Sequence, residues 1–123
     1  MGWWLDSEAM VHVCKDHSMF KTFDDSTIAK EVHLGNNARI NVSGQGSVEI
    51  DFTSGKKLTL LNVLYVPKIR KNLVLVDLLC KKGFWVSFES DKVILSKGDM
   101  FVGKGYENDG MYQLSINNMI ESS

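Results

Sequence analysis

Alternation of apolar and polar residues runs through much of the 123-residue chain. The clearest example is Val48–Phe52, in which Val48, Ile50 and Phe52 alternate with two acidic residues. A period of two predicts a strand with one buried face, and the same pattern recurs at Ala38–Val42 and Phe84–Phe88. With the shorter apolar runs, the pattern indicates about nine or ten short, closely spaced strands, as in a β-barrel or sandwich.

Loops with glycine or proline separate these runs. Thr53–Lys56 contains a glycine and joins Val48–Phe52 to Leu58–Leu60, which predicts a β-hairpin. A further strand is expected at Leu61–Val66, and Pro67, the only proline of the chain, ends it.

Helical signals are few. Asp77–Lys82 predicts one short helix, with two lysines near its C-terminal end and Gly83 as its cap. Ser18–Phe23 predicts a single helical turn, because Phe20 and Phe23 are three residues apart and would share an inward face.

Composition is that of an ordinary globular protein, with 44% apolar and 24% charged residues and a net charge of −1. We expect one domain over residues 1–116, followed by a polar tail at 117–123. The net charge gives no reason to expect direct nucleic-acid or membrane binding, and no apolar run reaches the ~18 residues of a membrane span. Two cysteines fit a reducing compartment.

The strongest candidate for chemistry lies near the start of the chain. Trp3–Leu5 predicts a buried strand, and Asp6 and Ser7 follow where it passes into a loop. A carboxylate at the end of a buried strand is costly to desolvate unless it has partners or a task. Two interpretations are open: Asp6 caps a turn, as Asp often does, or it belongs to a functional site.

The same stretch resembles the active-site strand of the aspartic proteases of copia-type LTR retrotransposons. The matching residues are Trp3, Trp4, Leu5, Asp6, Ser7, Ala9 and His12. Asn62–Glu89, with its Val-Leu-Tyr-Val-Pro run, and Met100–Leu114 also resemble blocks of that family.

The resemblance implies a retropepsin-like, closed or partly open all-β barrel within a Gag-Pol polyprotein, cytoplasmic or in a virus-like particle. It implies endoproteolysis of a polyprotein or peptide substrate with Asp6 as catalytic residue, Ser7 orienting it, and no cofactor. Residues 117–123 would lead towards a pre-integrase region.

Aspartic proteases need two carboxylates that share a proton. This chain offers one candidate, because Asp51 lies within an alternating strand and is expected to face solvent. The second carboxylate would therefore come from a second copy in a homodimer.

Three residues depart from the family pattern: Glu8 replaces glycine, Met10 replaces a hydroxyl residue, and Leu75 replaces serine. Glu8 would place like charge beside Asp6 at a dimer axis, and it would be strained if its φ were positive. We therefore expect proteolysis to be weak or lost, unless Glu8 points harmlessly to solvent. The alternative function is a non-catalytic β-barrel remnant that acts as a binding or structural module.

Other chemistries are disfavoured. A zinc site is not expected, because no Cys-x-x-Cys pair is present among the possible ligands His12, Cys14, His17, His33 and Cys80. Cys14 is instead expected to be a small buried residue. We expect a solvated face at the basic residues Lys68, Arg70, Lys71, Lys81 and Lys82. We expect core positions for the tryptophans Trp3, Trp4 and Trp85.

Overall fold

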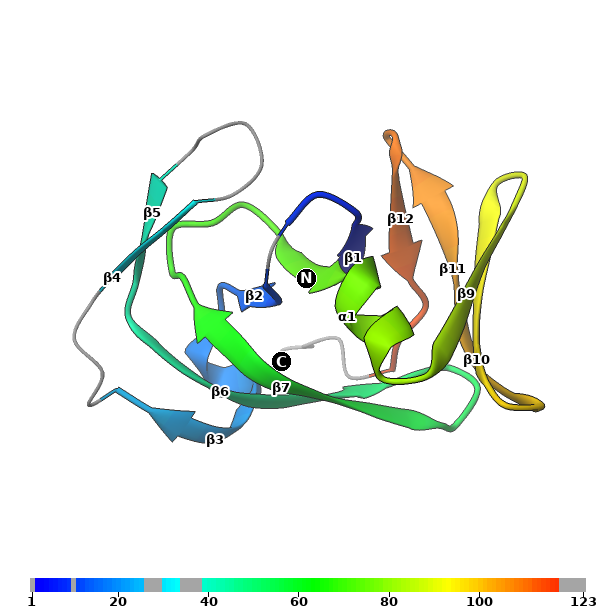
Figure 1. The fold of residues 1–123 in the computed structure, drawn as a ribbon, viewed down its shortest axis with the longest axis horizontal. Helices are drawn as coiled ribbons and strands as arrows, with labels where there is room; N and C mark the ends of the chain where they lie inside the picture. The colour runs from blue at the N-terminus through cyan, green and yellow to red at the C-terminus, as the bar shows by residue number, and fades with distance from the viewer. Residues whose placement is uncertain (1, 10, 26–29, 34–38, 118–123) are drawn as a thin grey trace.

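The computed structural model describes residues 2–9, 11–25, 30–33 and 39–117, and the side chains of 30–33, 39 and 40 are not described. Twelve strands, one 3₁₀ turn and one α-helix are found within these ranges (Figure 1). In chain order they are β1 Trp3–Asp6, β2 Val13–Cys14, η1 His17–Met19, β3 Phe20–Asp24, β4 Lys30–His33, β5 Arg39–Val42, β6 Gly44–Asp51, β7 Lys57–Tyr65, β8 Asn72–Leu75, α1 Val76–Lys81, β9 Phe84–Glu89, β10 Lys92–Lys97, β11 Met100–Asn108 and β12 Met111–Leu114. The predicted all-β class with one short helix is therefore confirmed.

Ten of these strands form one sheet in the order β3-β6-β7-β2-β8-β1-β12-β11-β10-β9, while β4 and β5 pair separately. The sheet does not close, because β3 and β9 remain as its two edges. Of the predicted alternatives, the partly open barrel is the one that forms. Most neighbours are antiparallel, but β1 pairs with β8 and β2 with β7 in parallel.

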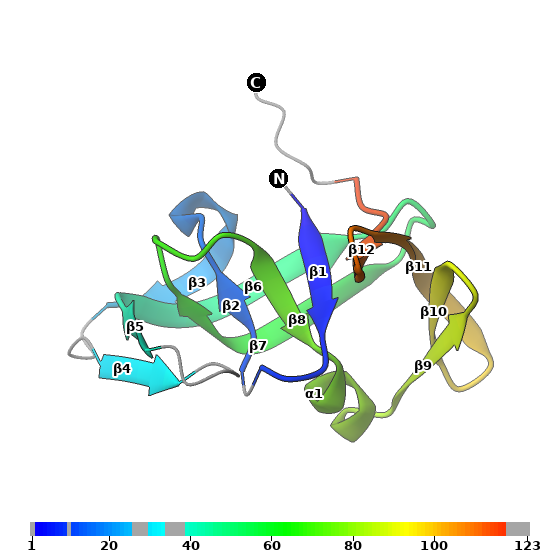
Figure 2. The ribbon, with the colours of Figure 1, turned by 90° about the horizontal axis from the view of Figure 1, so that it is seen from above.

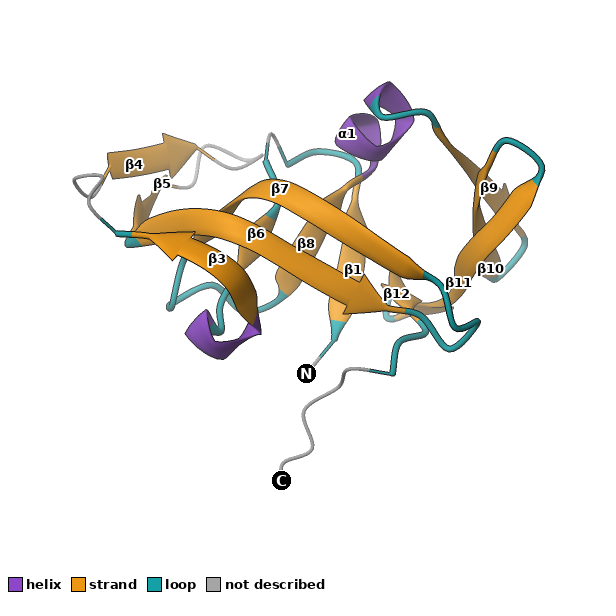
Figure 3. Cartoon of the chain, turned by 90° about the horizontal axis from the view of Figure 1, so that it is seen from below, coloured by secondary structure: helices purple, strands orange, loops and turns teal. Residues whose placement is uncertain are grey.

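The long pair β6 and β7 runs across the group formed by β2, β8 and β1 (Figures 2 and 3). Inward-facing residues of these strands and of β10 form one hydrophobic core. Its fully buried members include Trp3, Ile50, Leu60, Val74 and Leu95. Burial of this apolar surface is the main favourable term in folding.

The predicted hairpin and helix are both found. Ile50 lies opposite Leu58 in the β6–β7 pair, as the alternation requires. The helix begins one residue earlier than predicted, at Val76, and its Leu79 is buried. Gly83 follows it with φ +93, a conformation that glycine adopts without strain, and its N–H donates to the carbonyl of Cys80.

The predicted helical turn at Ser18–Phe23 is wrong. The helical structure in this region is limited to the 3₁₀ turn η1. Asp16 caps this turn, because its side chain accepts hydrogen bonds from the N–H and the hydroxyl of Ser18. The chain then enters β3, whose Phe20 pairs with Val48 of β6. A partner strand so far along the chain cannot be seen in a local pattern, and it overrides the weak helical spacing.

The two strands expected at Leu58–Leu60 and Leu61–Val66 are one continuous strand, β7. Asn62 has φ +57 within it, and the register against β6 shifts there. The sequence also predicts a turn at residues 35–37, because a glycine is followed there by two asparagines, and this turn lies outside the described residues. The domain boundary at residue 116 stays a prediction.

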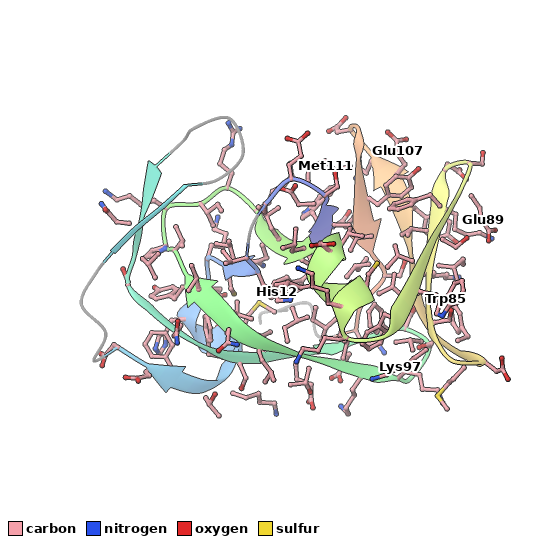
Figure 4. The ribbon with its side chains drawn as sticks, viewed as in Figure 1. His12, Trp85, Glu89, Lys97, Glu107 and Met111 are labelled. Atoms are coloured by element: carbon pink, nitrogen blue, oxygen red, sulfur yellow. The ribbon has the colours of Figure 1, made fainter. Side chains whose placement is uncertain are left out.

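The core position predicted for Trp85 is wrong. Its side chain is 71% exposed and lies on the outer side of β9 (Figure 4). Phe84 and Val86 pack against the core instead. Successive side chains of a strand point to opposite faces, so the alternation at Phe84–Phe88 itself placed Trp85 outside. Trp3 is fully buried as predicted, and Trp4 is half-buried.

Candidate functional site

Asp6 is the last residue of β1, which lies between β8 and β12 in the sheet. Trp3 and Leu5 point into the core and fix the strand, so Asp6 is presented where the buried strand ends. The sequence predicted this placement correctly. Ser7 and Glu8 follow in an exposed bend, and Ala9 returns to the interior.

The Asp6 carboxylate is held by its own loop. Its Oδ1 accepts the backbone N–H groups of Glu8 at 2.7 Å and Ala9 at 3.1 Å. This is turn-capping geometry, the first of the two interpretations of Asp6. It fixes one oxygen in place, and it is compatible with the second interpretation because a carboxylate has a second oxygen.

A pocket of about 260 Å³ lies beside Asp6. Besides Leu5–Glu8, it is lined by Val76, Phe88 and the turn and strand residues Gly110–Tyr112. The rings of Phe88 and Tyr112 meet edge to face at 5.0 Å, and the Tyr112 hydroxyl donates to the carbonyl of Ser90. Asp6 thus lines a partly apolar hollow, together with residues of α1, β9 and β12.

Leu75, the third departure from the family pattern, is the register partner of Asp6 in the parallel β1–β8 pair. It is buried. A hydroxyl at this position would lie beside the aspartate, whereas leucine supplies only apolar surface. Leu75 is therefore part of the surroundings of the site, although 69 residues separate it from Asp6 in the sequence.

His12 forms a hydrogen bond with Leu75, the residue that lies beside Asp6 in the sheet. It is buried, and its Nδ1 accepts the backbone N–H of Leu75 at 3.0 Å. Burial, reinforced by the positive charge of Lys82, lowers the pKa of His12 to about 4. A neutral imidazole at neutral pH is required for this acceptor role, and the proton then lies on Nε2.

Glu8 adopts an ordinary backbone conformation, because the positive-φ residues other than glycine are Asn62, Ser90 and Asp109 within the described ranges. The strain considered for Glu8 is therefore absent in this chain. The negative charge and the size of the Glu8 side chain are then the features that would oppose close contact with a second copy of the chain. Met10, the other departure in this loop, lies outside the described residues.

A second catalytic carboxylate is not supplied by Asp51. That residue lies in β6, and its Oδ1 accepts a hydrogen bond from the Lys57 ammonium group at 2.6 Å. This exposed ion pair accounts for Asp51, as its position in an alternating strand predicted.

Cys14 is buried, as predicted, and burial raises its pKa to about 11. Since the thiolate is the reactive form, this thiol is unsuited to nucleophilic chemistry near neutral pH. Among the described residues, histidine, cysteine and carboxylate side chains do not gather in groups of three that could hold a metal ion. In that same part of the chain, no helix is long and apolar enough to span a membrane.

Sequence reasoning missed the pocket wall and the role of His12. Phe88 lies in a strand that the alternation predicted, and Tyr112 lies in β12. The strand order that brings both residues beside Asp6 has no signal in the local sequence. In the sequence, His12 matches a position of the family pattern and is a possible metal ligand, and neither feature indicates its bond to Leu75. Its burial followed from the β2–β8 contact rather than from its neighbours in sequence.

Comparison with known proteins identifies the family of the chain. Residues 3–84 match the family model "Pol polyprotein, beta-barrel domain". Over 119 residues, 94% of the chain, it is 31% and 36% identical to the retrovirus-related Pol polyproteins from transposons RE1 and RE2 of Arabidopsis thaliana. It is 27% identical over 111 residues, 90% of the chain, to that from transposon TNT 1-94 of Nicotiana tabacum.

The chain spans only about 8% of each of these polyproteins. No solved structure matches it significantly. The family match covers β1, the loop after Asp6, β8 and α1, but not Phe88 of β9 or Tyr112 of β12, which line the pocket beside Asp6. This chain therefore belongs to the Pol polyprotein β-barrel domain family, of the kind found in copia-type retrotransposon polyproteins.

Proposed function

We propose that this domain is an aspartic-endopeptidase-type module of a copia-type polyprotein, with weak or lost activity in the present sequence. The observation that carries the proposal is the position of Asp6, at the end of a buried strand and beside a partly apolar pocket. Asp6 would be the catalytic residue, and Ser7 would orient it. The substrate would be a peptide segment of the polyprotein, in the cytoplasm or a virus-like particle.

Catalysis would require two copies of the chain. In a homodimer the two Asp6 carboxylates would share one proton, so that one activates water and the other polarises the scissile carbonyl. The hydrogen bonds from Glu8 and Ala9 would hold each carboxylate in position. Glu8 adds a second negative charge two residues from each Asp6, which opposes close approach of the two loops.

Restoring the loop should restore cleavage. We expect Glu8→Gly combined with Met10→Thr to raise hydrolysis of a copia-type Gag-Pol junction peptide by about 10- to 100-fold over wild type. The reason is that the double change removes like charge and returns a hydroxyl to the loop. Hydrolysis is measured from acidic to neutral pH, with a pepstatin-type inhibitor as a check on mechanism.

Asp6→Asn in the restored background is the matched control. An amide oxygen can still accept the N–H groups of Glu8 and Ala9, so the turn should persist, but it cannot act as general base. Cleavage should then be abolished with little loss of stability. Strong cleavage that survives Asp6→Asn would overturn the assignment. An inactive double mutant would direct attention to Leu75, where Leu75→Ser returns a hydroxyl beside Asp6.

The association state should depend on pH in a defined direction. We expect mainly monomer at micromolar concentration near neutral pH, because carboxylates from two copies would repel. Acidification, which lowers the negative charge carried by the two copies, should favour association, and Glu8→Gln should favour it at neutral pH. Sedimentation velocity measures this, and a tight dimer that loosens in acid would contradict the charge argument.

A second candidate function is a non-catalytic β-barrel that binds a partner. It is favoured by the hydrogen bonds that Asp6 accepts, which give this residue a role in the turn without catalysis, and by exposed apolar side chains on β9–β11 such as Trp85 and Phe101. Loss of activity in every restored variant, with the fold intact, would favour this function.

A further inference from the structure

A second pocket lies away from Asp6, where the first residues of β1 and β8 meet β12. Its volume is about 360 Å³. The side chains around it come from four separate parts of the chain: Trp4, Lys15, Arg70, Lys71, Asn72 and Gln113. The pairings of β1 with β8 and with β12, and of β2 with β8, bring them together.

Three cations and no carboxylate line this pocket. Within the described part of the chain, the ion pairs are made by Lys21, Lys57 and Lys81, and none involves Lys15, Arg70 or Lys71. Three like charges in one hollow repel one another, so their grouping is unfavourable without an anion. In a chain of net charge −1, the grouping is a local departure from the average surface.

The pocket is also held in shape before any ligand arrives. Asn72 is 1% exposed, and its side-chain oxygen accepts the N–H of Lys15 at 2.8 Å while its amide group donates to the carbonyl of Gly2 at 2.9 Å. One buried side chain thus ties together the segments that carry Lys15, Trp4 and Lys71. The Lys71 ammonium group lies 4.7 Å from the centroid of the Trp4 ring, which restrains it by a cation–π contact.

We propose that this pocket binds the phosphate group of a nucleotide, either free or within a single strand of nucleic acid. The guanidinium fork of Arg70 can bind two phosphate oxygens, and Lys15 and Lys71 supply further charge. Sites that bind single-stranded nucleic acid combine an aromatic side chain with several cations. The phosphates of the strand bind to the cations, and a base stacks on the aromatic ring. The Gln113 amide adds a neutral donor and acceptor at the rim.

This inference departs from the expectation that the domain does not bind nucleic acid directly. That expectation rested on net charge, which averages over the whole surface and cannot show where charges of one sign gather. Arg70 is exposed, as the predicted solvated face requires, and Lys71 is half-buried; both line this pocket together with Lys15 and Trp4.

Binding of a fluorescein-labelled oligothymidylate of about ten nucleotides, measured by anisotropy at low salt, tests the proposal directly. We expect Arg70→Gln and Lys71→Gln each to weaken binding about tenfold, the scale of one charge-assisted hydrogen bond. Each should also reduce the dependence of affinity on salt by about one phosphate contact. Circular dichroism of each variant verifies that these surface changes leave the fold intact.

Lys97→Gln is the matched control. Lys97 also lies over an aromatic ring, that of Phe84 at 4.8 Å, but on β10 and outside this pocket (Figure 4). The change removes the same charge and the same kind of contact, and we expect it to leave affinity unchanged. In separate competition experiments, inorganic phosphate, a mononucleotide or a glutamate-rich peptide is added to displace the labelled oligothymidylate.

Competition by phosphate, with the mononucleotide as effective as the oligonucleotide, supports a free nucleotide as the ligand. Tighter binding of the oligonucleotide supports a single strand. The proposal is overturned if no phosphate compound binds, if Lys97→Gln weakens binding as much as Lys71→Gln, or if the acidic peptide competes as well as the nucleotide.

Discussion

Trp3→Ala should lower the free energy of unfolding by about 3–5 kcal/mol, the usual cost of removing a fully buried large aromatic side chain. Trp3 is 0% exposed and belongs to the main core cluster with Val74 and Leu114. Since domains of this size are stable by about 5–15 kcal/mol, the loss would be a large fraction of the total. Urea denaturation of both proteins at one temperature measures the difference.

Two further substitutions separate burial from aromatic character. Trp3→Phe should cost much less, about 2 kcal/mol or below, because the indole Nε1 of Trp3 is buried without a hydrogen-bond partner among the described residues. Phenylalanine keeps most of the apolar surface and removes that unpaired donor. Trp85→Ala is the matched control on an exposed strand face and should stay within about 0.5 kcal/mol of wild type. A loss at Trp85 as large as that at Trp3 would contradict the described core.

The unfolding free energy should fall by about 2–3 kcal/mol between pH 7 and pH 4 on account of His12. The folded state lowers the pKa of His12 from 6.5 to about 4, so folding favours the neutral imidazole. This contribution is fully present above pH 6.5, declines as the pH falls below it, and is exhausted below about pH 4. Protonation would also remove the Nδ1 acceptor for the N–H of Leu75.

His12→Asn isolates that contribution, because its side-chain oxygen can accept a hydrogen bond near the position of Nδ1 but does not titrate. Urea denaturation across the same pH range should give a flatter curve for the variant, with the difference confined to pH 4–6.5. Carboxylates contribute equally to both curves and cancel in the comparison. Identical slopes for the two proteins would exclude His12 as the cause.

The candidate site should respond to the same titration. Leu75 is the register partner of Asp6, so loosening its bond to His12 loosens the strand beside the carboxylate. In acid, the Glu8→Gly, Met10→Thr variant would then combine two opposing effects: easier association of the loops that carry Asp6, and weaker support of those loops by β8.

Features that depend on neighbours along the chain could be predicted from the amino-acid sequence alone. Alternation at Val48–Phe52 set the hairpin of β6 and β7, and the lysines and Gly83 set the end of α1, because strand periods and caps are local. The apolar residues before Asp6 placed it at the end of a buried strand. The family resemblance rested on the same local blocks, and the family match confirms it.

Tertiary structure decided what depends on which strands become neighbours. Phe20 and Phe23 lie in a strand and not in the predicted helical turn, because β3 pairs with β6. The spacing of residues within a short stretch cannot indicate such a distant partner. The tertiary structure brought Leu75 opposite Asp6, gave His12 its bond to Leu75, and gathered Lys15, Arg70 and Lys71 around Trp4. Each of these contacts joins residues far apart in sequence through strand order, and strand order is fixed by burial of the common core rather than by any one stretch of the chain.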